Sequence, residues 1–117
     1  MESGIYVVEL LKENYTNAHE TRQRGRGTLV PSGSVKFGKT RNLDRRAFNY
    51  EVTFGLGNFI FKTILIKKDI DKIENEIKVL VNQYRIIGVY GRKLEWLTGI
   101  TLSELIKVIQ TVSNKYE

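Results

Sequence analysis

The positive charge of the sequence is concentrated in one block that could hold a phosphate backbone. The formal net charge is +6, yet residues 21–46 alone contain eight Lys and Arg against one Asp. Clustered cations of this kind are typical of surfaces that bind nucleic acid. We expect six residues of the block to contact the backbone: Arg22, Arg24, Arg26, Lys39, Arg41 and Arg45. The alternative is a solvated basic loop with no partner.

Several other kinds of chemistry are disfavoured by the residue types. The chain has no cysteine, which excludes disulfides and thiolate zinc sites. Its one histidine, His19, has no acidic or cysteine partner at metal-binding spacing. The Gly-x-Gly stretches at 25–27 and 55–57 lack the strand–helix context of a dinucleotide-binding motif.

Two short motifs carry a family resemblance. Gly4-Ile5-Tyr6 opens an apolar segment, and the run 36–46 reads Lys-Phe-Gly-Lys-Thr-Arg-Asn-Leu-Asp-Arg-Arg. Together they resemble the GIY-YIG nuclease family, whose core has GIY on one strand and Y-I/V-G on the next. A helix that begins near Asn-Leu follows and carries an essential arginine, and a later helix supplies a glutamate. The resemblance covers about residues 4–97.

The resemblance assigns roles to four residues before the later helix. Tyr6 matches the tyrosine that contacts the attacking water and is credited as a general base. A phenol has a pKa near 10, so this role requires nearby cations or a metal-bound water. Arg46 matches the arginine that holds the scissile phosphate, for which a planar guanidinium is well suited. Tyr50 lies one helical turn further on, where relatives carry His or Tyr within reach of the site. Gly38 matches the YIG glycine, where a small residue permits close approach of strand and helix.

The sequence departs from the family at the tyrosine of YIG, where it has Lys36. Some restriction-type relatives also carry lysine there. A lysine can orient or deprotonate the water, or stabilise negative charge beside it. Alternatively, Lys36 marks a degenerate copy that binds without cutting. The 29 residues between the two triplets exceed the usual ten or so, which indicates a basic loop inserted at about 12–34 that faces DNA and buries little.

The metal-binding glutamate is expected on the helix 69–84. Helical periodicity leaves Glu74 and Glu76 both open, because they lie on opposite shoulders of the apolar stripe. The resemblance to phage-type members favours Glu74, followed by Ile77, Val81 and Arg85, with Glu95-Trp96 as the counterpart of a downstream motif. The alternative for Glu74 is a surface pair with Lys78. Mg²⁺ or Mn²⁺ held by one carboxylate, waters and a phosphate oxygen suits such a site.

The expected elements form an α+β domain over residues 1–117, with a small mixed or antiparallel three-stranded sheet flanked by helices. Strands are expected over 5–11, 35–38 and 58–66, with 52–54 as a lead-in or hairpin partner. Helices are expected from Thr40 or Asn42 to about Tyr50, over 69–84, and after the capping box 101–104 through Ile109. A glycine-containing connection is expected over 86–92, and Trp96 in the core.

These observations together predict a metal-dependent endonuclease that hydrolyses DNA phosphodiester bonds. The rival hypothesis is a catalytically degenerate module of the same fold that binds nucleic acid. No recognition domain is expected after the nuclease core, so specificity would come from the loop, a homodimer or a separate partner. No signal peptide or membrane span is expected, and the absence of cysteine agrees with the cytoplasm, or with a host-cell nucleic-acid compartment for a mobile element.

Overall fold

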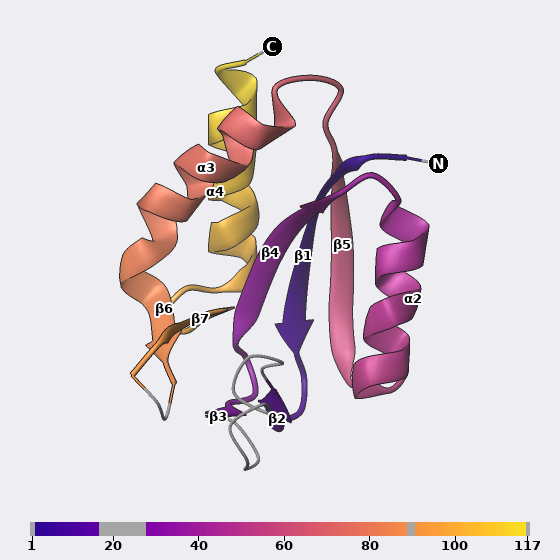
Figure 1. Cartoon of the computed structure of the whole chain (residues 1–117), viewed down its shortest axis with the longest axis vertical. Coiled ribbons are helices and arrows are strands. Elements are labelled where there is room, and N and C mark those ends of the chain that lie inside the picture. The colour runs from indigo at the N-terminus through magenta and orange to yellow at the C-terminus, as the bar shows by residue number, and fades with distance from the viewer. Residues whose placement is uncertain (1, 17–27, 89–90, 117) are drawn as a thin grey trace.

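The computed structural model describes residues 2–16, 28–88 and 91–116. Its elements follow in the order β1 (Gly4–Leu10), β2 (Asn14–Thr16), β3 (Thr28–Val30), β4 (Val35–Thr40), α2 (Leu43–Phe54), β5 (Phe59–Leu65), α3 (Ile70–Val81), η1 (Asn82–Tyr84), β6 (Arg85–Ile87), β7 (Lys93–Leu97) and α4 (Leu102–Asn114) (Figure 1). This arrangement is an α+β fold, as the sequence predicts.

The main sheet has five strands in the order β5-β1-β4-β7-β6, and each pairing is antiparallel. The expected three strands are present as β5-β1-β4, but the prediction of a three-stranded sheet is wrong. Residues 85–87 and 93–97, at and beyond the two ends of the connection predicted over 86–92, form β6 and β7, a hairpin that pairs with β4 where Val35 lies opposite Leu97. Strands of three and five residues around a glycine-containing turn carry too little periodicity to be recognised.

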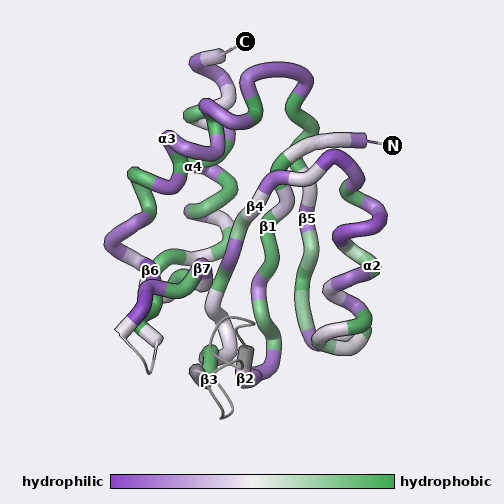
Figure 2. The backbone as a smooth tube through the Cα atoms, viewed as in Figure 1, coloured by the Kyte–Doolittle hydropathy of each residue, from purple (hydrophilic) through white to green (hydrophobic). Residues whose placement is uncertain are grey.

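The helices divide between the two faces of the sheet. Figure 1 shows α3 and α4 together on one side of β1, β4 and β5, and α2 on the other. Successive residues of a strand point to opposite faces. Ile5 and Val7 of β1 therefore belong to a core with α3 and α4, whereas Tyr6 and Val8 belong to a core with α2. Figure 2 shows the same division, with apolar strands between helices that are polar along much of their length.

Side-chain caps fix where α2 and α4 begin. The Asn42 side chain accepts a hydrogen bond from the backbone N–H of Arg45 (3.1 Å) at the start of α2. Thr101 and Glu104 form the predicted capping box of α4. The prediction of extended structure at 52–54 is wrong, because α2 continues to Phe54 and ends at Gly55 with φ of 88°. No helix in the described ranges is long and apolar enough to cross a membrane.

The inserted segment contributes to the core at its C-terminal end. β2 and β3 pair as an antiparallel ribbon, and the residues between them lie outside the described part of the chain. Val30 is fully buried in the core beneath α2, and Ser34 is also buried. The expectation that the whole of 12–34 buries little is therefore wrong for residues 28–34.

Candidate active site

Four of the predicted catalytic residues line one pocket of about 750 Å³. Tyr6 comes from β1, Lys36 from β4, Arg46 from α2 and Glu74 from α3. The fifth, Tyr50, lies behind Tyr6, and their hydroxyl oxygens are 3.5 Å apart. The fold thus brings together residues that are up to 68 positions apart in the sequence.

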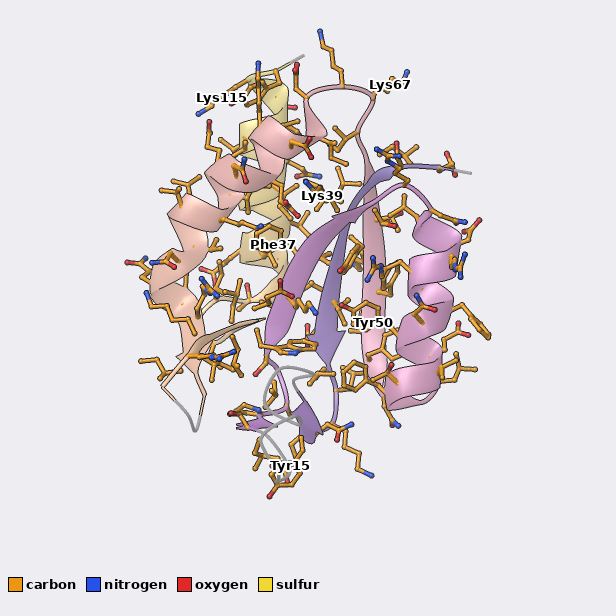
Figure 3. All side chains as sticks on the ribbon, in the orientation of Figure 1. Tyr15, Phe37, Lys39, Tyr50, Lys67 and Lys115 are labelled. Atoms are coloured by element: carbon orange, nitrogen blue, oxygen red, sulfur yellow. The ribbon has the colours of Figure 1, made fainter. Side chains whose placement is uncertain are left out.

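Strand β4 gives the pocket access to both faces of the sheet. Four consecutive residues, 36–39, line the pocket, and consecutive side chains of a strand alternate between faces. In Figure 3, Phe37 and Lys39 lie on the side of β4 toward α3, whereas Tyr50 lies between α2 and the strands. The pocket therefore extends around one edge of β4, where charges from both faces can meet.

Gly38 makes room for the tyrosine. It lies directly opposite Tyr6 in the β1–β4 register. A Cβ atom at position 38 would lie 2.6 Å from Cζ of Tyr6 and closer still to its hydroxyl oxygen. The glycine is thus required by the tyrosine ring that crosses it, and not by the close approach of strand and helix that the resemblance implies.

Burial controls the acidity of Tyr6. The ring is only 4% exposed and stacks on Phe61, with ring centroids 5.5 Å apart. Burial raises the pKa of Tyr6 well above its usual range, and proximity to Tyr50 raises it further, whereas Lys36 and Arg46 lower it. Desolvation has the largest effect, so the phenol keeps its proton at neutral pH. This is the state of a hydrogen-bond donor, and it argues against Tyr6 as the base that the resemblance implies.

Arg46 is oriented over the tyrosine ring. Its guanidinium carbon lies 5.6 Å from the ring centroid of Tyr6, a cation–π contact. Its backbone N–H bonds to the carbonyl of Asn42 in the first turn of α2. Within the described ranges it forms no salt bridge with Asp44 or Glu51, the partners a surface role would favour. Its planar donors can therefore reach an anion in the pocket.

Lys36 sits in an aromatic cradle. Its Nζ lies 5.7 Å from the ring centroids of both Tyr50 and Trp96, and 3.3 Å from a carboxylate oxygen of Glu95. Trp96 is buried in the core, as predicted. Only a fifth of the lysine side chain is exposed, so its ammonium is held at a fixed place beside Tyr6 and Arg46 in the pocket wall.

The two glutamates of α3 have different surroundings. Glu74 lines the pocket and is 6% exposed, and its Oε1 lies 3.5 Å from Nζ of Lys39 and 3.4 Å from Nζ of Lys78. Glu76 faces α4, where it pairs with Lys115 and accepts a hydrogen bond from Tyr116. Periodicity alone could not distinguish them, but only Glu74 is placed beside Tyr6 and Arg46.

The donor set of the pocket fits a hard divalent ion only in an open form. No group of three His, Cys, Asp or Glu residues suited to a metal occurs among the described residues. Glu74 offers carboxylate oxygens, and the remaining ligands would be waters and a phosphate oxygen. Mg²⁺ favours this type of coordination over a cage made wholly of protein ligands.

The residues predicted to contact a phosphate backbone differ in where they lie. Lys39 lines the pocket, where it pairs with Asp71 as well as Glu74, while Arg41 and Arg45 are exposed beside it in sequence. Arg22, Arg24 and Arg26 lie outside the described residues.

Sequence reasoning gave no functional role to Asp71 or Lys78, although both lie one helical turn from Glu74. Arg85 also lines the pocket, but its guanidinium donates to the carbonyls of Lys93 and Leu94 and anchors the β6–β7 hairpin. The spacing of Asp71 and Lys78 from Glu74, one helical turn on either side, is the signal in the sequence that points to them.

Comparison with protein families, with curated proteins and with solved structures found no match to this chain.

Proposed function

We propose that this protein is a divalent-metal-dependent endonuclease that hydrolyses DNA phosphodiester bonds in the pocket at the edge of β4. The observation that carries the proposal is the convergence of Tyr6, Lys36, Arg46 and Glu74 from four separate elements. These residues are the ones that the resemblance to GIY-YIG nucleases selects. The pocket also has five cationic side chains and two carboxylates, a balance that attracts a phosphate diester.

Each residue has a task that follows from its surroundings. Arg46 binds the scissile phosphate with two donors and offsets the charge that develops on its oxygens. The fixed ammonium group of Lys36 stabilises the negative charge that develops on the attacking oxygen. Tyr6 keeps its proton and orients the attacking water or a phosphate oxygen by donating a hydrogen bond, and Tyr50 supports it from behind.

Glu74 is the residue that would hold Mg²⁺ or Mn²⁺, together with waters and a phosphate oxygen. The ion would supply charge that stabilises the leaving oxygen and acidifies a bound water. Because Tyr6 holds its proton, solvent and not the phenol accepts the proton of the attacking water.

A second function has one observation in its favour. Lys39 and Lys78 neutralise the Glu74 carboxylate, as they would in a module that has lost its metal and only binds nucleic acid. Such a module would use the same cations to bind a backbone and would need no divalent ion. The two functions therefore differ in whether cleavage occurs and whether Glu74 is essential.

A plasmid-nicking assay with Mg²⁺ or Mn²⁺ tests the proposal. We expect the parent protein to convert supercoiled plasmid to nicked or linear forms, and Glu74→Gln to reduce the rate at least about a hundredfold. Glu76→Gln is the matched control, because it changes the same type of side chain on the same helix but faces Lys115. Cleavage by Glu74→Gln at the parental rate would remove Glu74 from the site. A parent that binds DNA but never cuts would support the binding module.

A further inference from the structure

Glu74 is held by two ammonium groups through a single oxygen atom. Nζ of Lys39 lies 3.5 Å and Nζ of Lys78 lies 3.4 Å from Oε1. The glutamate side chain is 8% exposed, whereas those of Lys39 and Lys78 are 42% and 58% exposed. The carboxylate is thus fixed in the pocket wall, while both cations extend toward solvent on flexible stems.

This arrangement places the lysines in competition with a divalent ion. An ion that binds Glu74 must approach the oxygen that the two ammonium groups already contact, and like charges at such distances repel strongly in a partly buried site. The free protein should therefore bind a divalent ion weakly, with one or both lysines displaced. A displaced Lys39 can keep its ion pair with Asp71, whose side chain is largely exposed.

A phosphate backbone would relieve the competition. Lys39, Lys78 and Arg46 line the same pocket, so a DNA backbone that binds there would bring phosphate oxygens into the space that these three cations face. A lysine ammonium is a point charge that readily exchanges a carboxylate for a phosphate oxygen. Once the lysines turn to the phosphate, the Glu74 carboxylate is free and the bound phosphate adds a further oxygen ligand.

We propose that Lys39 and Lys78 are positioning residues that hold Glu74 until a DNA backbone draws them away, so that the divalent ion and DNA bind the pocket cooperatively. The inference rests on the proposed metal role of Glu74, and it assigns the coupling between ion and DNA to the two lysines that pair with that residue. Coupling between two ligands is reciprocal, so each must tighten the binding of the other by the same factor.

The first test measures the ion alone. Mn²⁺ binding to the protein without DNA is followed by electron paramagnetic resonance of the free ion. We expect the double variant K39Q/K78Q to bind Mn²⁺ about tenfold more tightly than the parent, and each single variant to lie between them. The control K68Q/K72Q removes the same charge from exposed lysines that form no salt bridge with Glu74 in the described structure, and it should bind as the parent does.

The second test measures the coupling through DNA. The affinity for a labelled duplex is measured by fluorescence anisotropy with and without Ca²⁺ at constant ionic strength. Ca²⁺ should tighten DNA binding by the parent about five- to tenfold, whereas the factor should fall for K39Q/K78Q, in which only the shared phosphate oxygen still couples the two ligands, and should approach one for Glu74→Gln. Thermal melting of every variant shows that it is folded.

The outcomes separate this inference from the proposed function. Equal Mn²⁺ affinities for the parent, K39Q/K78Q and K68Q/K72Q would overturn the inference, even in a protein that cuts plasmid. An equal gain in the two double variants would also overturn it, since general charge would then be the cause. Tighter Mn²⁺ binding by K39Q/K78Q and not by K68Q/K72Q, with the coupling to DNA reduced, would support it even where plasmid nicking fails.

Discussion

The two faces of the sheet differ in chemistry more than in size. The face beneath α3 and α4 is packed with aliphatic side chains, among them Ile77, Leu105 and Ile109, all of them fully buried. The face beneath α2 is rich in aromatic rings, and two cations, Lys36 and Arg46, lie over them. The aliphatic core offers packing alone, whereas the rings of the aromatic core also attract cations.

The difference shows how one small domain can separate stability from chemistry. Aliphatic side chains contribute through buried area and offer nothing to a cation. An aromatic ring contributes buried area as well, and its face attracts an ammonium or guanidinium group. The candidate site lies at the edge of β4, where the aromatic face supplies Tyr6, Lys36 and Arg46 and the side of α3 supplies Glu74 with its two lysines.

The largest effect is expected from a cavity in the aliphatic face. Leu105→Ala removes a fully buried side chain of α4, which does not line the pocket. Substitutions of this kind lower the free energy of unfolding by about 2–5 kcal/mol. Urea unfolding measures the loss, and plasmid nicking per folded molecule should be unchanged. A large fall in nicking with little loss of stability would break the comparison.

A smaller effect is expected from overpacking the aromatic face. Gly38→Ala places a methyl group against the ring of Tyr6, which Phe61 and Tyr50 hold in place. Overpacking of this kind costs about 1–3 kcal/mol, and nicking should fall with it because the ring must move. In a Tyr6→Leu background the same change should cost much less. Additive losses in the double variant would show that the ring is not what requires glycine at this position.

The sequence indicated which residues come together in the fold more fully than it indicated the sheet. Tyr6, Lys36, Arg46 and Glu74 were chosen by their match to short motifs, and the fold places them around one pocket. The β6–β7 hairpin was missed because its strands are short and its pattern weak. The lysine contacts of Glu74 were foreseen only as the pair with Lys78, since nothing in the sequence indicates that β4 brings Lys39 alongside α3.

The acidity of Tyr6 could not be predicted for a related reason. The sequence shows the cations 36 and 46 that lower the pKa of a phenol, and it does not show how deeply the ring is buried. Burial depends on Phe61 from β5 and on Tyr50 from α2, which come together only in the folded chain. Desolvation then outweighs both cations, and the phenol that the resemblance implies as a general base keeps its proton.

The smallest effect is a pH dependence that tests this reversal. The folded pKa of Tyr6 is raised above the value of about 10 expected in the unfolded chain, so the unfolded state loses the proton first as the pH rises. The resulting contribution to stability is fully present below pH 10 and is lost as the pH climbs from there through the folded pKa. At pH 11 the loss should be about 1.4 kcal/mol.

The measurement compares urea unfolding of the parent and of Tyr6→Phe at pH 9 and pH 11. Lysines and the other tyrosines also titrate in this range, but they are common to both proteins, so the difference between the two losses reports the Tyr6 phenol together with its effect on the neighbouring Tyr50. We expect the parent to lose more stability than Tyr6→Phe over the interval. Parallel losses would mean that Tyr6 ionises near its ordinary pKa in the folded chain. The cations over the aromatic face would then govern its acidity, and the phenolate would again be available as the base.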